Sequence, residues 1–309
     1  GQGAQSKIAS KREAPPYWAF AVNPEIGGSG TAAGADRAAR HVPGSTAAFT
    51  YAQVQDLYKA PDWHPEGHPT MPEVVARGRK PEVYACGYCH LPNGQGRPEN
   101  ASLAGLPASY IREQLANFKS GARKSSEPRQ KPVNNMIQVA AKVNEKEIQA
   151  AAEYFSRLKP KPWIRVVETR IVPQTHVAGW MLVRSNAGAN EPIGQRIIEM
   201  PEDLERTELR DDASGFVAYV PVGSVKRGEL LVTRGETRCA VCHGADLRGH
   251  ENAPSIVGRS PSYVVRQLFD MQSGARKGAV DVLMKPVVAR LTLEDMVAIA
   301  AYLASKGPS

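Results

Sequence analysis

Two short motifs, CGYCH at residues 86–90 and CAVCH at residues 239–243, contain every cysteine of the 309-residue chain. Their reactive side chains are those of Cys86, Cys89, His90, Cys239, Cys242 and His243. A C-x-x-C pair suits three different chemistries: a redox-active dithiol, part of a zinc site, or the covalent attachment of a haem. The choice among them decides what the protein does.

The covalent attachment of a haem explains both motifs best. A thioredoxin-like dithiol needs a βαβ context and gives no reason for two copies that each end in histidine. A zinc ribbon places its C-x-x-C pairs about 15 to 20 residues apart, whereas Cys86 and Cys239 are 153 residues apart. In C-x-x-C-H, the two thiols form thioethers with the porphyrin and the histidine becomes the proximal iron ligand. We therefore predict two covalent c-type haems with their iron.

The sequence around the two motifs is an internal repeat. A shift of 153 residues places SYIREQLANFKSGARK (109–124) on SYVVRQLFDMQSGARK (262–277) without a gap. Further along, a shift of 148 residues places EIQAAAEYFSRL (147–158) on DMVAIAAYLASK (295–306). The chain therefore contains two copies of one domain.

Helices must position the two motifs. Ile111, Leu115 and Phe118 recur at i, i+4 and i+7, which predicts a short helix with an apolar stripe. Gly121 is expected to end this helix, and Gly274 marks the same point in the second copy.

The last segment of each copy also has the pattern of a helix. Asn144 with Glu147, and Thr292 with Asp295, are spaced as N-cap pairs. The alanines of these helices fit two interpretations, close approach of another helix or simply high helix propensity.

A haem iron bound by histidine needs a sixth ligand unless it is to bind small molecules. Met136 is the one methionine between Cys86 and the end of the first copy, in KPVNNMIQV, which we expect to be a loop over the porphyrin. Met284 aligns with it, whereas Met271 and Met296 align with positions of helix stripes and are expected in the core. The predicted iron ligands are His90, Met136, His243 and Met284.

These residues resemble the bacterial dihaem cytochromes c built from two class I cytochrome c domains. The likeness runs through CAVCHG, PSIVG, SGARK, LMKPVV and LTLEDMVAIAAYL over about residues 226–307, and over about 73–160 in the first copy. It implies a mainly helical fold with one electron carried per haem. The family has a proline after the haem motif, present as Pro254 but replaced by Ala101 in the first copy. Its carbonyl is expected to accept the free N–H of the proximal histidine.

The predicted architecture is mainly α, with four parts. They are an extended N-terminal arm (1–72), a first cytochrome c domain (73–160), an inter-domain segment (161–225) and a second cytochrome c domain (226–309). Glycines and prolines indicate that the arm lies over the surface. Short β-branched runs in the inter-domain segment predict two or three β-hairpins.

Composition narrows the partners and the compartment. The formal net charge is +8, which favours redox protein partners with an acidic docking face. The sequence has no basic stripe interleaved with aromatic residues, which is the pattern of a nucleic-acid-binding surface. No apolar run approaches the ~20 residues of a membrane span. The start lacks the apolar region of a signal peptide, so we expect the mature form of a periplasmic protein.

Two functions compete on this evidence. The first is an electron carrier, in which histidine and methionine fill both axial positions of each iron and exclude substrates. The second is a dihaem enzyme such as a cytochrome c peroxidase, which needs an open haem with acid–base groups above it. No distal glutamate or histidine is identified, so the carrier is favoured and no catalytic residue is assigned.

Two further features lead to narrower hypotheses. The first copy has a longer loop before Met136, and its added Arg129 and Lys131 could form a docking patch for an acidic partner. His64 and His68 have the i, i+4 spacing of metal ligands, but the proline and glycine between them argue against a helix. We therefore do not favour a metal site formed by these two histidines.

Overall fold

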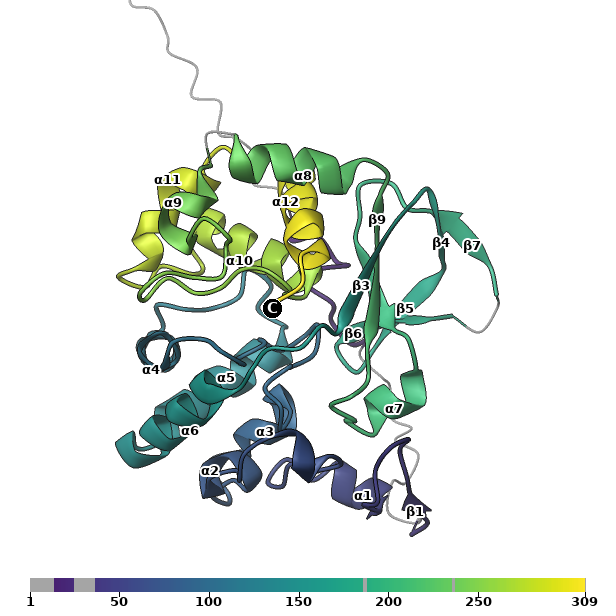
Figure 1. Cartoon of the computed structure of the whole chain (residues 1–309), viewed down its shortest axis with the longest axis vertical. Helices are drawn as coiled ribbons and strands as arrows, with labels where there is room; N and C mark the ends of the chain where they lie inside the picture. The colour runs from purple at the N-terminus through teal and green to yellow at the C-terminus, as the bar shows by residue number, and fades with distance from the viewer. Residues whose placement is uncertain (1–13, 25–36, 186–187, 235–236, 309) are drawn as a thin grey trace, which may run out of the picture.

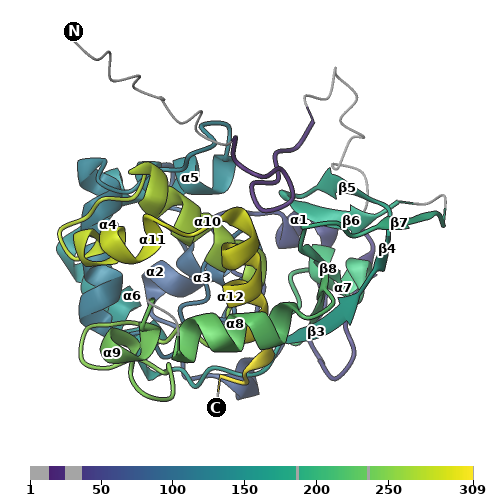
Figure 2. The same ribbon diagram turned by 90° about the horizontal axis from the view of Figure 1, so that it is seen from above.

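A computed structural model describes residues 14–24, 37–185, 188–234 and 237–308. Two helical domains lie one above the other, and a β-rich segment flanks them on one side (Figures 1 and 2). The first domain contains α2 (Glu73–Ala76), α3 (Cys86–His90), α4 (Ala108–Ser120), α5 (Lys131–Lys142) and α6 (Glu145–Arg157). The second contains α8 (Ser224–Thr233), α9 (Cys239–His243), α10 (Pro261–Ser273), η2 (Asp281–Met284), α11 (Lys285–Val288) and α12 (Leu293–Ser305).

The predicted helices of the repeat form with the predicted ends. Gly121 caps α4 with φ 75° and Gly274 caps α10 with φ 83°, both in the left-handed region that glycine adopts without strain. Asn144 and Thr292 form complete capping boxes at the starts of α6 and α12.

The packing of α8 on α12 explains one glycine and the alanines of α12. A Cβ added at Gly228 would lie 2.0 Å from the carbonyl oxygen of Ala298. Ala298, Ala300 and Ala301 are all buried. Small residues therefore allow these two helices to approach closely, which supports the first of the two interpretations of the alanines.

The predicted loop around Met136 is wrong, because Met136 lies on the helix α5. Pro132 occupies the first turn of this helix. Main-chain N–H groups in the first turn of a helix have no intrahelical acceptor, so a proline there, which lacks an N–H, costs no hydrogen bond. The proline therefore starts the helix rather than preventing it. Met284 is the last residue of η2, a 3-10 turn.

The inter-domain segment is not built of hairpins alone. Its elements are β3 (Ile164–Thr169), β4 (Ile171–Pro173), β5 (Thr175–Ala178), β6 (Met181–Arg184), β7 (Asn190–Pro192), β8 (Ile198–Pro201), α7 (Leu204–Glu208) and β9 (Phe216–Pro221). Among the described strands of this segment, only β5 and β6 form a tight antiparallel hairpin, whereas β4 pairs with β7. The first and last strands, β3 and β9, pair in parallel, and β8 pairs with β9 in antiparallel orientation. A parallel pair needs a long crossover, which here is the rest of the segment.

The N-terminal arm is more than a surface strap in its described part. Trp18 and Phe20 are buried in the core of the second domain, where the Phe20 ring lies 5.5 Å from that of Phe269. Trp63 is also buried and donates its ring N–H to the carbonyl of Leu209 at 2.7 Å. Burying aromatic rings removes a large apolar area from water, which outweighs the preference of the flanking glycines and prolines for loops.

The arm forms only short elements, and part of it falls outside the described residues. The elements are β1 (Ala39–Arg40), β2 (Phe49–Thr50), α1 (Tyr51–Val54) and η1 (Pro65–Gly67). Most of the glycine- and alanine-rich stretch after Glu25 is not described.

The two domains meet through equivalent residues of the repeat. The Arg123 guanidinium donates to the hydroxyl of Tyr263 at 3.0 Å, and that of Arg276 donates to the hydroxyl of Tyr110 at 3.2 Å. The main-chain N–H of Lys124 donates to the second domain at Ala275, 2.9 Å away. The SGARK segments therefore join the two copies reciprocally.

Candidate haem sites

Four predicted residues of the first copy line one cavity of about 630 Å³. Cys86, Cys89 and His90 reach it from α3, and Met136 reaches it from α5. Part of the remaining wall is apolar and includes Phe155, whose ring centroid lies 6.1 Å from that of His90. A cavity of this size and lining accommodates a large, mostly apolar group attached through the thiols.

Both motif histidines have their imidazole rings oriented in the same way. His90 Nδ1 donates to the carbonyl of Ala101 at 2.8 Å, and His243 Nδ1 donates to that of Pro254 at 2.8 Å. This confirms the expected role of these two carbonyls, alanine included. Burial lowers the pKa of both histidines, which keeps the rings neutral and leaves Nε2 free to bind a metal.

The cysteine environment argues against a redox dithiol. Burial raises the pKa of the Cys86 thiol to about 12, and burial also raises the pKa of Cys89. A disulfide exchange site needs an accessible thiolate with a lowered pKa. The zinc alternative also fails, because α3 and α9 place the two cysteine pairs in different helical domains.

The predicted site residues of the second copy lie at or near the core of the second domain. Cys239 and Met284 both pack, partly buried, against the hydrophobic core of the second domain. Cys242 is exposed. Met296 is fully buried in the core and Met271 packs against it, in the positions expected from the helix stripes.

Buried cations line the first cavity, and the sequence did not indicate them. Arg97 forms an ion pair with Glu99 at 2.8 Å, and both side chains are buried. Arg266 reaches the cavity from α10 of the second domain. Burial lowers the pKa of both arginines, although nearby carboxylates such as Glu99 act in the opposite direction. Such guanidinium groups suit the propionate groups of a haem.

The inter-domain segment covers the first site, which the sequence analysis also missed. Arg210 lies with its guanidinium carbon 3.6 Å from the centroid of the Tyr88 ring and donates to the Tyr88 carbonyl at 3.0 Å. Trp180 and Met181 line the same cavity. Tyr88, between the two cysteines, is only 4% exposed. Its counterpart Val241 is 75% exposed, so the tyrosine-for-valine difference was the available signal.

Comparison with known proteins places these features in a family. The family model described as Cytochrome c matches residues 75–159. Cytochrome c-554(548) of Halomonas halodenitrificans is 36% identical over 69 residues, covering 22% of this chain and 83% of that protein. A thiosulfate dehydrogenase electron acceptor of Thiomonas intermedia is 28% identical over 237 residues, covering 73% of this chain and 80% of its own length.

Among solved structures, reduced recombinant cytochrome c4 from Pseudomonas stutzeri aligns with a TM-score of 0.46 and 21% identity. The alignment covers 71% of this chain and 92% of that chain. The chain belongs to the cytochrome c family, as a dihaem electron-transfer cytochrome with class I cytochrome c domains and covalently bound haem c.

Proposed function

We propose that this protein is a periplasmic carrier that exchanges electrons with its redox partner through the second domain. The observation that carries the proposal is the contrast between Tyr88, which Arg210 and the inter-domain segment cover, and the exposed Val241. Each of these residues lies between the two cysteines of its motif. Electron exchange needs close approach of a partner to a haem, which an uncovered motif permits.

The proposal includes the iron ligands and the domain limits. Residues 73–160 would hold one haem through His90 and Met136, and residues 226–309 would hold the other through His243 and Met284. The matching orientation of the two histidines and the shared cavity of His90 with Met136 support this assignment. When bound, each haem supplies a one-electron redox centre.

Exposed apolar side chains border the second site on its methionine side as well. Val280, Val282 and Leu283 are all exposed immediately before Met284. The aligned positions of the first copy are Pro132, Asn134 and Asn135. Large exposed apolar residues mark interaction surfaces when they cluster around a functional site. We name Val241, Val280, Val282 and Leu283 the apolar edge.

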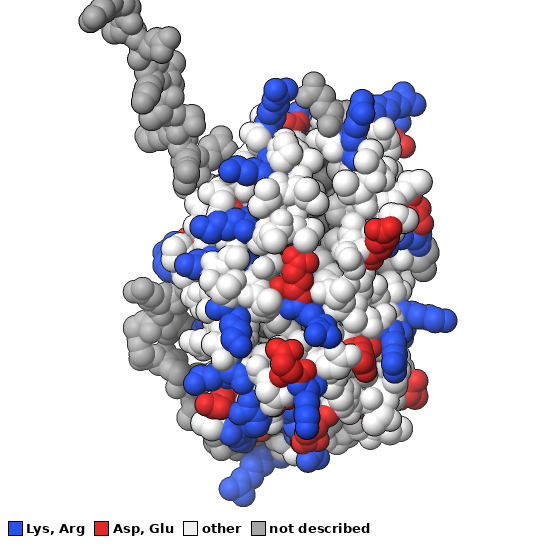
Figure 3. Space-filling model, turned by 90° about the vertical axis from the view of Figure 1, so that its left-hand side faces the viewer, with Lys and Arg blue, Asp and Glu red and all other residues white. Residues whose placement is uncertain are grey.

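The charge around the apolar edge suits an acidic partner. Lys277, Lys285 and Arg290 are exposed on the segments that flank η2. Figure 3 shows the face of the molecule with α4, α9 and α11, where an uncharged area in the upper half is bordered by Lys and Arg side chains on the left and at the top, and by some Asp and Glu side chains on the right and below. A partner with an apolar centre and an acidic rim complements such a surface.

The loop of the first copy is a weaker candidate for docking. Arg129 donates to Glu127 at 2.9 Å through two of its nitrogens, which offsets much of its charge. Lys124, at the start of this loop, is bonded through its main chain to the second domain. The docking role of Arg129 and Lys131 remains a prediction.

We further infer a carrier rather than an enzyme. A methionine is available to each iron, and the relative from Thiomonas intermedia is named an electron acceptor. A thiosulfate dehydrogenase is accordingly the donor that we propose to test. Neither the matched family nor the relatives described above support the peroxidase alternative. No helix among the described ranges is long and apolar enough to cross a membrane.

The experiment compares reduction rates of the oxidised holoprotein by a thiosulfate dehydrogenase supplied with thiosulfate. Leu283→Asp should slow reduction at least several-fold at low salt, because it removes apolar contact and repels an acidic rim. Ile171→Asp is the matched control, since Ile171 is also a large, exposed apolar residue but lies on β4. Both haem spectra should stay unchanged. Equal rates for the two variants would contradict docking at the apolar edge.

A further inference from the structure

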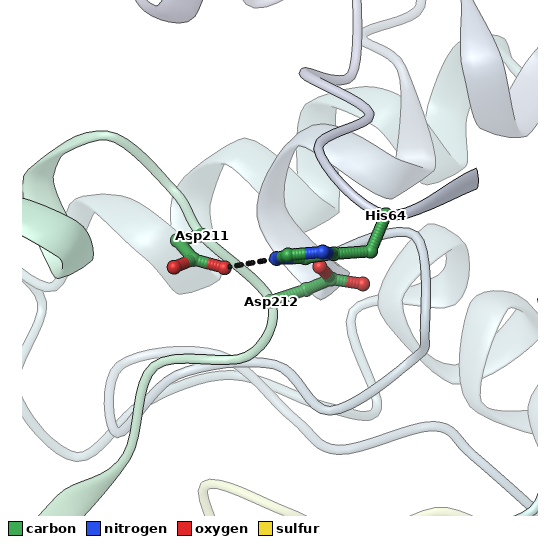
Figure 4. Close-up of side chains that lie close together, drawn as sticks. All are labelled: His64, Asp211 and Asp212. Atoms are coloured by element: carbon green, nitrogen blue, oxygen red, sulfur yellow. Dashed lines mark hydrogen bonds and ion pairs between the residues drawn. The ribbon is translucent and has the colours of Figure 1, made fainter. Parts of the chain in front are cut away.

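A histidine and two aspartates meet outside the haem sites. His64 precedes η1, and Asp211 and Asp212 follow α7, so the group joins the N-terminal arm to the inter-domain segment. One potential ligand atom from each of the three side chains lies within 4.8 Å of the others. His64 Nε2 is 2.9 Å from Asp211 Oδ1, and the Asp212 carboxylate lies beside the imidazole ring (Figure 4).

Asp212 is buried close to two histidines, His64 and His68, and to two other carboxylates, Asp211 and Asp62. The residue is only 5% exposed, and its Oδ1 makes no hydrogen bond. Leaving a buried carboxylate oxygen without a hydrogen bond or counterion is costly. A buried carboxylate with an unpartnered oxygen, beside a histidine and a second carboxylate, therefore points to a cation-binding site.

The surrounding residues already hold the potential ligands in place. Asp211 accepts from Arg206 Nε at 2.7 Å and from the N–H of Ala213 at 2.9 Å. The main chain of Asp212 accepts from the Asn93 side chain at 2.6 Å. Metal ligands in proteins are commonly oriented by such outer hydrogen bonds.

We propose that His64, Asp211 and Asp212 bind one divalent cation of the zinc class. One imidazole nitrogen and two carboxylate oxygens form the mixed donor set that Zn²⁺ accepts, with water in the fourth position. Calcium and magnesium prefer oxygen ligands alone, so the histidine favours the transition metal. Binding would replace the hydrogen bond between His64 and Asp211 with two metal bonds, and the proton on the bound nitrogen would pass to solvent.

The cation would connect the two segments beside the first haem site. Trp63, next to His64, already donates to the carbonyl of Leu209 in the inter-domain segment. Arg210, which covers Tyr88, directly precedes Asp211. Metal binding at His64 and Asp211 would therefore hold the arm against the part of the inter-domain segment that covers the first site.

The test measures metal content in the mature dihaem protein. Chelator-treated holoprotein is dialysed against Zn²⁺, desalted and analysed by mass spectrometry for zinc and iron, with the two haem irons as an internal standard. Wild-type protein should retain one zinc per two irons, and Zn²⁺ should raise its melting temperature. Excess Ca²⁺ or Mg²⁺ should not displace the zinc.

Two variants and a control decide the outcome. Asp212→Asn and His64→Gln should each lose the retained zinc and the zinc-dependent rise in melting temperature. Glu205→Gln, an exposed change in the adjacent α7, should retain both. Unchanged haem spectra would show that the variants fold. Absence of retained zinc in the wild type, or equal retention in Asp212→Asn, would overturn the proposal.

Discussion

His90 and His243 each donate Nδ1 to a carbonyl eleven residues further along, one from alanine and one from proline. The acceptor is a main-chain carbonyl, so it can accept this hydrogen bond whatever side chain its own residue carries. Proline restricts the backbone at that point, but the same hydrogen bond forms at 2.8 Å with alanine there. The proximal histidine therefore depends on backbone geometry rather than on the identity of residue 101.

The methionine assignments are testable one haem at a time. Met136→Ala and Met284→Ala should each open one iron, so that the reduced variant binds about one carbon monoxide per protein by optical titration. Met271→Ala is the control, since Met271 packs against the same core as Met284 without a proposed ligand role. Rapid carbon monoxide binding by the wild-type protein would show that an iron is open from the start.

At the scale of elements, the contact of α8 with α12 depends on the absence of a side chain at Gly228. Gly228→Ala should destabilise the second domain by about 1 to 3 kcal/mol, the usual range for overpacking, because its Cβ would overlap the Ala298 carbonyl. The measurement is denaturant unfolding of the holoprotein. Leu230→Ala, at an exposed position of the same helix, should change the stability much less. A stable Gly228→Ala protein would mean that the helices can separate freely.

Strand β8 and helix α10 meet at a buried carboxylate. Glu199 accepts from Ser260 at 2.7 Å and from the N–H of Ser262 at 3.1 Å, while its Oε1 has no partner. Burial raises the pKa of Glu199 despite these bonds and the nearby Arg266. The contact therefore anchors the inter-domain segment to the second domain, with a residual cost for the ionised form.

This shift predicts a pH dependence of stability. Because the folded pKa exceeds the unfolded value, the folded state holds its proton more tightly, and stability falls as the pH rises from about 4 through the folded pKa. The free energy of unfolding of Glu199→Gln, relative to wild type, should therefore increase between pH 4 and pH 7. Glu202→Gln controls for losing one exposed carboxylate. A pH-independent difference between Glu199→Gln and wild type would contradict this account.

At the scale of the whole molecule, the two copies are joined but not equivalent. The inter-domain segment covers the first site, and residues of both this segment and the N-terminal arm join the core of the second domain. The two haems therefore sit in different surroundings although their attachment motifs match. The two domains therefore differ in how exposed their sites are, and the apolar edge of the second domain is the proposed contact with the partner.

The junction of the domains contains a buried ion pair that should matter for stability. Arg276 lies 2.7 Å from Asp281, and both side chains are almost fully buried. Arg276→Ala would leave Asp281 uncompensated and break the bond to Tyr110, so a loss of about 3 kcal/mol is expected in denaturant unfolding. Arg227→Ala removes an exposed arginine that pairs with two acids, and should cost less than about 1 kcal/mol. Equal losses for both variants would contradict the role of burial.

The sequence by itself was enough to predict the haem attachment points, and it determined the duplication and the helix ends. C-x-x-C-H is covalent chemistry within five residues, and the capping pairs at Asn144 and Thr292 act within one helical turn. Such short-range features are encoded by residue type and spacing. The prediction of a loop at Met136 also rested on local sequence, but it was wrong, because a proline at the start of a helix looks the same in sequence as a proline in a loop.

Only the tertiary structure decided which residues surround these points. Arg210 covers Tyr88 from 122 residues away, and His64 meets Asp211 from 147 residues away. Trp18 enters the core of the second domain from the opposite end of the chain. No local pattern specifies such pairs, because they form only when chain folding buries apolar area and brings distant segments together. The difference between the two haem sites arises from these contacts.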